Sequence, residues 1–265
     1  MIKNIECIDL EVTEIISLHK NFYKLRLTPP KWDWNVGQFV MIRPNDWGFD
    51  PFLPRPFSIS QLDDEKLEIF FQVVGRGTYL LSHLKPKNKV KVWGPLGKGF
   101  KINLNLPILI IAGGMGIAPF VGFIKNHPNP EKIEVIFGHR MPLSCYPISE
   151  FPKQILIWTI EDKNEKDLEK LKRAIKVKIE GYSSDGQILA CGPLPFLKMI
   201  FSECYTKRTH VQFSLERPMA CGIGACLSCV IPSPHGENFK VCMDGPVFLC
   251  EDLSILFKQQ PLIMP

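Results

Sequence analysis

Four cysteines lie close together near the C-terminus of a chain whose nine cysteines are otherwise dispersed. Cys221, Cys226, Cys229 and Cys242 form the pattern C-x4-C-x2-C-x12-C. Thiolates are soft ligands that suit zinc, copper(I) and iron–sulfur clusters. Structural zinc sites usually combine two short knuckles, whereas three ligands on one loop and a fourth that returns alone are typical of plant-type [2Fe–2S] proteins. We therefore predict a [2Fe–2S] cluster, with a zinc site and unligated or disulfide-forming cysteines as alternatives.

The residues between the first two cysteines are small. Gly222 and Gly224 let the loop wrap closely, which brings backbone N–H groups near sulfur and tunes the potential of a cluster. His235 lies between the third and fourth cysteines, and we interpret it as a loop histidine rather than a ligand. Cys250 falls outside the spacing and is interpreted as a buried or spare thiol.

A second group of residues suits a phosphate-bearing ring. The sequence Arg55-Pro56-Phe57-Ser58 follows a predicted strand. Arginine binds phosphate oxygens through two parallel hydrogen bonds, an aromatic side chain packs on a ring, and a hydroxyl reaches a ring nitrogen. The segment 75–78 opens a short predicted helix, and N–H groups at a helix start suit a pyrophosphate. A surface turn that leads into a strand would explain the same four residues.

A glycine-rich turn follows the apolar run 106–112. Gly113, Gly114 and Gly116 would let a dinucleotide approach the carboxyl end of a sheet, although a tight strand–helix turn without a ligand needs glycine too. Cys191 ends a later predicted strand, so its thiol would face the same crevice. Structural burial is the alternative for this lone cysteine.

The elements that position these residues fall into two types. Alternating apolar patterns at 11–17, 23–27, 36–43 and 66–74 predict short antiparallel strands, a small barrel or sandwich, with one short helix at 79–84. From residue 104 the pattern changes. Apolar runs at 106–112, 133–138, 155–160, 187–191 and 211–215 alternate with helical patterns at 117–125, 165–175 and 195–204. This alternation predicts a doubly wound parallel sheet.

The composition is that of a folded protein with several domains. The chain has 265 residues, 45% of them hydrophobic and 22% charged, with a net charge of +5. The charge is too small and too scattered to indicate a nucleic-acid partner. We see no apolar run of about 18 residues and no signal segment, so we expect no membrane span. An odd number of cysteines without a signal segment favours a reducing, cytoplasmic location.

The order of these motifs resembles the ferredoxin–NADP reductase superfamily across residues 5–205. The motifs are Arg55-Pro-x-Ser58, Gly77-Thr78, Gly113-Gly-x-Gly116-x-Ala118-Pro119 and Cys191-Gly-Pro193. The tail, at 219–229 and 241–248, resembles one branch, the electron-transfer subunits of two-component dihydroorotate dehydrogenases. The resemblance implies an FAD-binding antiparallel β-barrel at 1–102, a nicotinamide-dinucleotide-binding α/β domain at 103–205 and a [2Fe–2S] domain at 206–265.

The resemblance also implies roles for single residues. Arg55 would bind the FAD pyrophosphate, Phe57 would lie against the flavin, and Ser58 would approach its N5. Gln72 stands where the family often has arginine. NAD(H) would bind with its phosphates at Gly113, Gly114 and Gly116 and its nicotinamide near Cys191. The full set implied for FAD is Arg55, Pro56, Phe57, Ser58, Phe70, Phe71, Gln72, Gly77 and Thr78.

The implied function is electron transfer. Electrons would pass from an FMN-containing dihydroorotate dehydrogenase subunit through the cluster and FAD to NAD+, in pyrimidine (UMP) biosynthesis, within a heterotetramer of two plus two subunits. We expect no catalytic general base or nucleophile. An exposed apolar patch around the tail would meet the partner, with Val247, Phe248 and Leu249 as candidates, although core packing would explain these three residues equally well. An NAD(P)H-linked reductase subunit of a hydrogenase or ferredoxin system and a non-enzymatic zinc-stabilised binding module are the alternatives.

Overall fold

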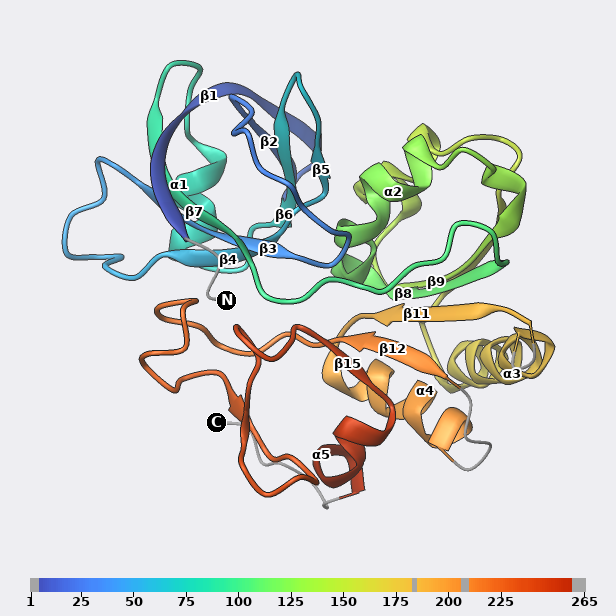
Figure 1. The fold of residues 1–265 in the computed structure, drawn as a ribbon. Helices are drawn as coiled ribbons and strands as arrows, with labels where there is room; N and C mark the ends of the chain where they lie inside the picture. Colours follow the sequence, from blue (N-terminus) through green and yellow to red (C-terminus); the bar gives the residue numbers. More distant parts are fainter. Residues whose placement is uncertain (1–4, 183–184, 206–209, 259–265) are drawn as a thin grey trace.

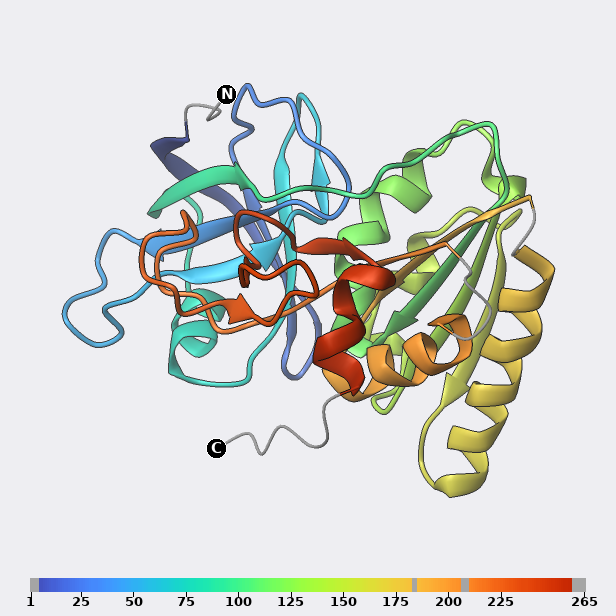
Figure 2. The same ribbon diagram turned by 60° about the horizontal axis from the view of Figure 1, so that its bottom comes forward.

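Two sheets lie beside each other, and the C-terminal tail runs along both of them (Figure 1). The computed structural model describes residues 5–182, 185–205 and 210–258. Turning the molecule shows the tail in front of the boundary between the two sheets (Figure 2). In the part of the chain that the structure describes, no helix has the length and apolar character needed to cross a membrane.

The first sheet is antiparallel and has the strand order β4-β3-β7-β1-β2-β6-β5. The prediction of an antiparallel N-terminal sheet is confirmed, but the described strands form a curved open sheet, because no pairing joins β4 to β5. Leu25, Ile69 and Val92 are fully buried in its core. Its elements are β1 (Glu6–His19), β2 (Phe22–Leu27), β3 (Phe39–Pro44), β4 (Arg55–Ser58), β5 (Gln61–Leu62), β6 (Leu67–Gln72), α1 (Arg76–Ser82) and β7 (Lys89–Leu96).

The second sheet has the order β10-β9-β8-β11-β12-β15, with five parallel strands and β15 antiparallel at one edge. Apolar residues of the inner strands point to both faces, as the continuous apolar runs predict. The strands are β8 (Ile108–Gly113), β9 (Ile133–His139), β10 (Leu156–Glu161), β11 (Gln187–Cys191), β12 (Val211–Ser214) and β15 (Val247–Leu249).

Helices cover both faces of this sheet. α3 (Glu165–Tyr182), α4 (Leu194–Tyr205) and α5 (Ser254–Lys258) pack on one face. The 3-10 helix η1 (Gly114–Phe120) and α2 (Val121–Asn126) pack on the other. The chain order reverses between β8 and β11, which is the point where open α/β sheets bind ligands.

Three expectations differ from the structure. The segment 117–125 is not one α-helix, because Pro119 lies inside η1 and α2 begins only at Val121. The helix predicted at 165–175 continues to Tyr182, with Ile179 buried on the sheet side. The tail contributes a strand, β15, to the second sheet, so two strands of that sheet come after residue 205.

The sheets share part of their core. Phe22, Phe70 and Phe100 of the N-terminal half belong to the same buried cluster as Phe120 and Tyr146. The remaining short elements are η2 (Pro130–Lys132), η3 (Leu143–Cys145), η4 (Pro147–Glu150), β13 (Val230–Ile231), β14 (Phe239–Lys240) and η5 (Glu251–Leu253). This shared core fixes the carboxyl end of β8 next to the wall formed by β6.

Candidate functional site

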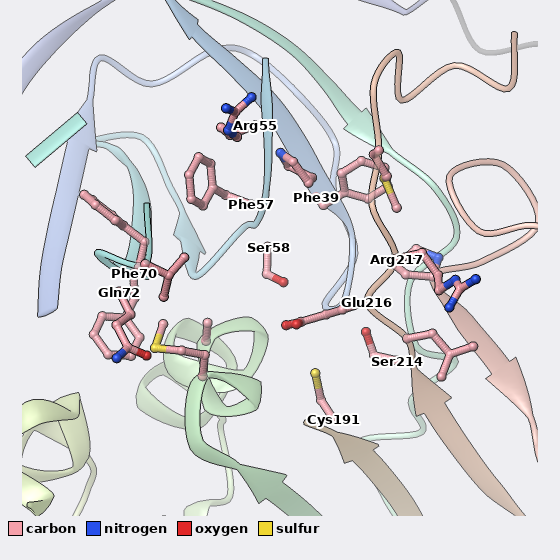
Figure 3. Close-up of a pocket in the computed structure, with 18 of the residues that line it drawn as sticks. Phe39, Arg55, Phe57, Ser58, Phe70, Gln72, Cys191, Ser214, Glu216 and Arg217 are labelled. Carbon is pink, nitrogen blue, oxygen red and sulfur yellow. The ribbon is translucent and has the colours of Figure 1, made fainter. Parts of the chain in front are cut away.

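A cavity of about 500 Å³ opens where the first sheet, the second sheet and the tail meet (Figure 3). β4 and β6 form one wall, η1 and the end of β11 form the floor, and the segment 214–219 forms the opposite wall. Most of the residues implied for FAD therefore come together. Those that line the cavity are Arg55, Pro56, Phe57, Ser58, Phe70, Phe71, Gln72 and Thr78, together with Cys191.

The Arg55 side chain is fixed by contacts with Leu53, Trp47 and Gly77. Its Nη1 donates to the carbonyl of Leu53 at 2.8 Å, and its guanidinium lies 5.9 Å from the ring centroid of Trp47. Its Nε faces Gly77, where an added Cβ would lie only 2.7 Å away. A side chain at position 77 would thus collide with the guanidinium, so the glycine lets Arg55 pack closely against the start of α1.

Thr78 is committed to the start of α1. Its hydroxyl oxygen accepts hydrogen bonds from the N–H groups of Val74 and Gly75 at 2.9 and 3.2 Å, and it donates to the Gly75 carbonyl. Thr78 lines the cavity, but its hydroxyl already has three partners, so it shapes the loop more than it offers a free donor.

Three reactive side chains point toward the middle of the cavity from three different elements. They are the hydroxyl of Ser58 on β4, the thiol of Cys191 at the end of β11, and the carboxyl of Glu216 after β12 (Figure 3). Burial raises the pKa of the Cys191 thiol, with a further rise from the Glu216 carboxylate, so the thiol stays protonated. Desolvation also raises the pKa of Glu216.

The tail wall was not predicted from the sequence. It comprises Ser214, Leu215, Glu216, Arg217, Pro218 and Met219, with Pro246 beside it. The Nε atom of Arg217 is buried and has no hydrogen-bond partner, which is costly unless a ligand accepts from it. Together with the Arg55 guanidinium on the other wall, this orphaned donor suits a large anionic cofactor. A glutamate and an arginine directly after an apolar run were the available signal.

The glycines after β8 do not line this cavity. An added Cβ at Gly116 would lie 2.2 Å from the carbonyl oxygen of Cys191, so the turn packs on the end of β11. Gly113 is confined in the same way by Phe196, at 2.9 Å. Gly114 has φ +53 and only the Tyr146 hydroxyl within reach of a Cβ, at 3.9 Å. Close packing therefore accounts for two of the glycines, and a role at nucleotide phosphates stays a prediction.

The four tail cysteines are arranged around backbone N–H donors. The N–H groups of Ile223 and Cys226 point to the Cys221 sulfur, each at 3.4 Å, and that of Gly224 points to Cys242 at 3.2 Å. The N–H of Cys242 points to the Cys229 sulfur at 3.4 Å. Such donors stabilise sulfur that carries negative charge, as in ligated thiolate.

The thiols associate in two pairs. The Cys221 side chain lowers the pKa of Cys226, and the Cys229 side chain raises that of Cys242, with a smaller effect from Cys221. Hydrogen bonding, first from the Ser228 N–H, lowers the pKa of Cys226 to about 7, and burial raises the pKa of Cys242 to about 12. Across the described residues no group of three or more cysteine, histidine or acidic side chains could hold one metal ion. The paired arrangement suits a [2Fe–2S] cluster, in which each iron takes two cysteines.

The surface beside the cysteines is apolar, but not where it was expected. Phe248 is buried and Val247 is half-buried, because β15 pairs with β12, whereas Leu249 is 39% exposed. The exposed apolar side chains are instead Ile223 and Leu227 in the cysteine loop, at 46% and 61%. His235 is exposed and contacts Asp252, away from the thiols.

Comparison with known proteins defines first a class and then a family. A solved structure described as an NADH-dependent reduced ferredoxin-NADP oxidoreductase has a TM-score of 0.75, with 21% identity, over 92% of this chain and 88% of that one. A ferredoxin reductase of carbazole 1,9a-dioxygenase has a TM-score of 0.66 and 16% identity, over 80% and 70%. The fold is thus that of the ferredoxin reductases.

Sequence relatives narrow this class. The model of the iron-sulfur cluster binding domain of dihydroorotate dehydrogenase B matches residues 216–254. The dihydroorotate dehydrogenase B (NAD(+)) electron transfer subunit of Clostridium acetobutylicum is 33% identical, over 92% of this chain and 96% of the relative. An electron transfer subunit homolog of Aquifex aeolicus is 32% identical, over 94% and 98%. The chain belongs to the family of dihydroorotate dehydrogenase B electron transfer subunits.

This membership confirms the predicted class of protein, an electron-transferring oxidoreductase subunit with an iron–sulfur domain. The predicted cofactors, FAD, a [2Fe–2S] cluster and NAD(H), agree with the family and the fold.

Proposed function

We propose that this chain carries electrons from a dihydroorotate-oxidising, FMN-containing partner to NAD+, with FAD in the cavity and a [2Fe–2S] cluster at the four tail cysteines. Bound FAD can exchange both single electrons and a hydride, whereas the cluster exchanges only single electrons. One observation carries the proposal: a single cavity takes its walls from the first sheet, the second sheet and the tail that holds the cysteines.

Different wall residues would bind different parts of FAD. Arg55, whose guanidinium packs against Gly77, would bind the pyrophosphate. Phe57 and Phe71, whose ring centroids lie 5.7 Å apart, would support the flavin from the sheet side. Arg217, with its unpartnered Nε, would bind an oxygen acceptor on the tail side. These contacts would orient the ring toward the Cys191 end of β11 and shield that end from water.

Glu216 and Ser58 would serve the proton that accompanies electron transfer. Desolvation raises the pKa of Glu216 above its ordinary value, which favours the protonated carboxyl as a proton donor in the cavity. Ser58 points into the same space from the opposite wall (Figure 3). Cys191 stays a thiol and marks where the nicotinamide would stack, next to the turn that contains Gly114.

The tail brings the cysteines close to the cavity. The Trp93 Nε1 of β7 donates to the carbonyl of Cys221 at 3.1 Å, which ties the cysteine loop to the first sheet. An added Cβ at Gly222 would lie 2.6 Å from Met41 of β3. The cysteine loop therefore packs directly on the sheet that forms the flavin wall, and a short electron path follows from this packing.

The partner would dock on the face that contains the cysteine loop. Ile223 and Leu227 flank the exposed Cys226, and Figures 1 and 2 both place the loop between β3 and β4 on the same side. That loop exposes Phe49, Phe52 and Leu53, at 93%, 63% and 44%. Both segments thus expose apolar side chains on one side of the molecule, as a protein interface would. Two copies of each subunit would form the assembly.

Chemical analysis and an assay together test the proposal. The chain is prepared anaerobically with its FMN-containing partner, and flavin, iron, sulfide and zinc are measured, followed by NAD+ reduction with dihydroorotate. We expect FAD, iron and sulfide in the chain and NADH formation that depends on dihydroorotate. Zinc without colour would support a binding module, and a coloured protein active only with hydrogenase or ferredoxin partners would support the other reductase class.

A further inference from the structure

A buried network of charges lies between the two sheets, apart from the cavity. Lys24 of β2 is 1% exposed and pairs with the fully buried Glu68 of β6, with 3.2 Å between Nζ and Oε1. Lys24 also forms a short ion pair with Glu150 of η4. Arg26 binds the other oxygen of Glu68 at 2.8 Å, and Lys125 of α2 binds Glu150 at 2.9 Å.

This network crosses from one sheet to the other. Lys24 and Glu68 belong to the flavin-side sheet, whereas Glu150 and Lys125 belong to the segments that cover the nucleotide-side sheet. Taking a lysine fully out of water is costly unless its partners are fixed in place. The buried Lys24 therefore holds η4 against β2 in one position, and the two lysines lower the pKa of Glu150 despite its partial desolvation.

The network lies directly behind residues of the proposed site. Lys24 is paired in register with Phe70 of the cavity wall, and Glu68 precedes Phe70 by two positions on β6. Glu150 follows Tyr146 along the same covering segment. The Tyr146 ring lies 6.4 Å from that of Phe70, and its hydroxyl is the atom nearest to a Cβ built at Gly114.

We propose that the Lys24–Glu150 ion pair is a positioning element that sets how closely the nucleotide-side sheet approaches the flavin cavity. The inference rests on the proposed function. Loosening the pair would let Tyr146 and the Gly114 turn move relative to Phe70, so the nicotinamide and the flavin would meet at a wrong distance. Electron entry from the partner would not change, because that route passes through the tail.

Two substitutions test the pair without leaving a lone buried charge. In Lys24→Met, Glu68 keeps Arg26 and Glu150 keeps Lys125. In Glu150→Gln, Lys24 keeps Glu68, so this second variant serves if the first does not fold. Lys91→Met is the matched control, because it removes the half-exposed Lys91–Asp9 pair on the same sheet.

Flavin reduction is measured by stopped flow in the complex with the partner, once with NADH and once with dihydroorotate. We expect the NADH-driven rate to fall about 10- to 100-fold in both variants, since misplacement by an ångström costs this much. The dihydroorotate-driven rate, FAD content and iron content should match the wild type and Lys91→Met. Equal losses with both reductants, or no loss, would overturn the inference alone. A wild-type complex that neither reductant reduces would overturn the proposed function as well.

Discussion

The two walls of the cavity are built in different ways. On the sheet wall, Phe70 and Phe71 are 2% exposed and are fixed by the register of β6 against β2. On the tail side, the described stretch 215–229 runs from the tail wall to the cysteines. It contains neither helix nor strand. A few single bonds hold it, such as Leu215 N–H to the Pro246 carbonyl at 2.9 Å and Ser228 Oγ to the Pro218 carbonyl at 3.2 Å.

The two walls therefore depend on bound cofactors to different extents. Strand pairing and a buried core position the sheet wall whether or not a cofactor is bound. The tail instead keeps its shape through N–H groups turned toward sulfur and through left-handed residues, among them Leu227 at φ +58. We infer that ligation stabilises the tail as much as packing does, because metal binding contributes directly to folding where regular structure is lacking.

The largest expected effect follows from replacing Cys229, a buried residue proposed as a cluster ligand. Cys229→Ser should abolish the cluster and lower dihydroorotate-dependent NAD+ reduction more than about 100-fold. The reason is that replacing a residue that only hydrogen bonds to a metal ligand already costs about 10- to 100-fold in metal affinity. NADH oxidation with a dye that accepts electrons from the flavin should persist, because the sheet wall is independent. Iron content and both activities are measured, with the exposed Cys7→Ser as control. Full iron content in the Cys229 variant would contradict the assignment.

The same difference explains what could be predicted from the sequence. β11 begins and ends at the predicted residues, and the Arg55–Ser58 and four-cysteine motifs were found, because periodicity and spacing are local signals. Glu216 and Arg217 were missed because their only local signal, two charged residues after an apolar run, is weak. They enter the site only through the fold. The bond between Trp93 and Cys221 joins residues that are 128 positions apart, and the short β15 forms only because β12 offers it an edge.

The next effect concerns the sheet wall. Gly77→Ala should weaken FAD binding by about 10- to 100-fold, because the new Cβ displaces Arg55 from the pyrophosphate and a hydrogen bond to a charged group contributes about 1.5–3 kcal/mol. Gly75→Ala is the control, since nothing lies within 4 Å of a Cβ there. Flavin fluorescence during titration gives both dissociation constants. Equal affinity in the two variants would show that Arg55 does not bind FAD.

Replacing Leu227 by glycine should change the stability of the chain and its affinity for the partner in opposite directions. A leucine in the left-handed region costs about 1–2 kcal/mol, so Leu227→Gly should leave the free energy of unfolding unchanged or raise it by up to about 1 kcal/mol. The same change removes an exposed apolar side chain from the proposed docking face, and affinity for the partner should fall about tenfold, or about 1.4 kcal/mol. Urea unfolding and titration with the partner measure the two effects.

Leu156→Gly is the matched control for this pair of measurements. Leu156 is 52% exposed on β10, away from the cysteine loop and outside the left-handed region. Glycine in a strand costs about 0.5–1 kcal/mol, so this variant should lose stability and keep its affinity for the partner. If both leucine variants weaken partner binding equally, the docking face lies elsewhere.

The smallest expected effect is the titration of Glu216 in the tail wall. The surrounding cavity walls partly desolvate the carboxyl and raise its pKa in the folded chain above the ordinary 4.5. As the pH rises past 4.5, the unfolded chain releases this proton first, so folding loses stability until the folded carboxyl has titrated too. Glu216→Gln cannot lose a proton. Its advantage in the free energy of unfolding over wild type should therefore grow from near zero below pH 4.5 to a plateau toward neutral pH.

The plateau should stay below about 1 kcal/mol, because the side chain is exposed within the cavity. Urea unfolding of the flavin-free chain across this range measures it, and an advantage that shrinks with rising pH would show that the tail wall stabilises the carboxylate.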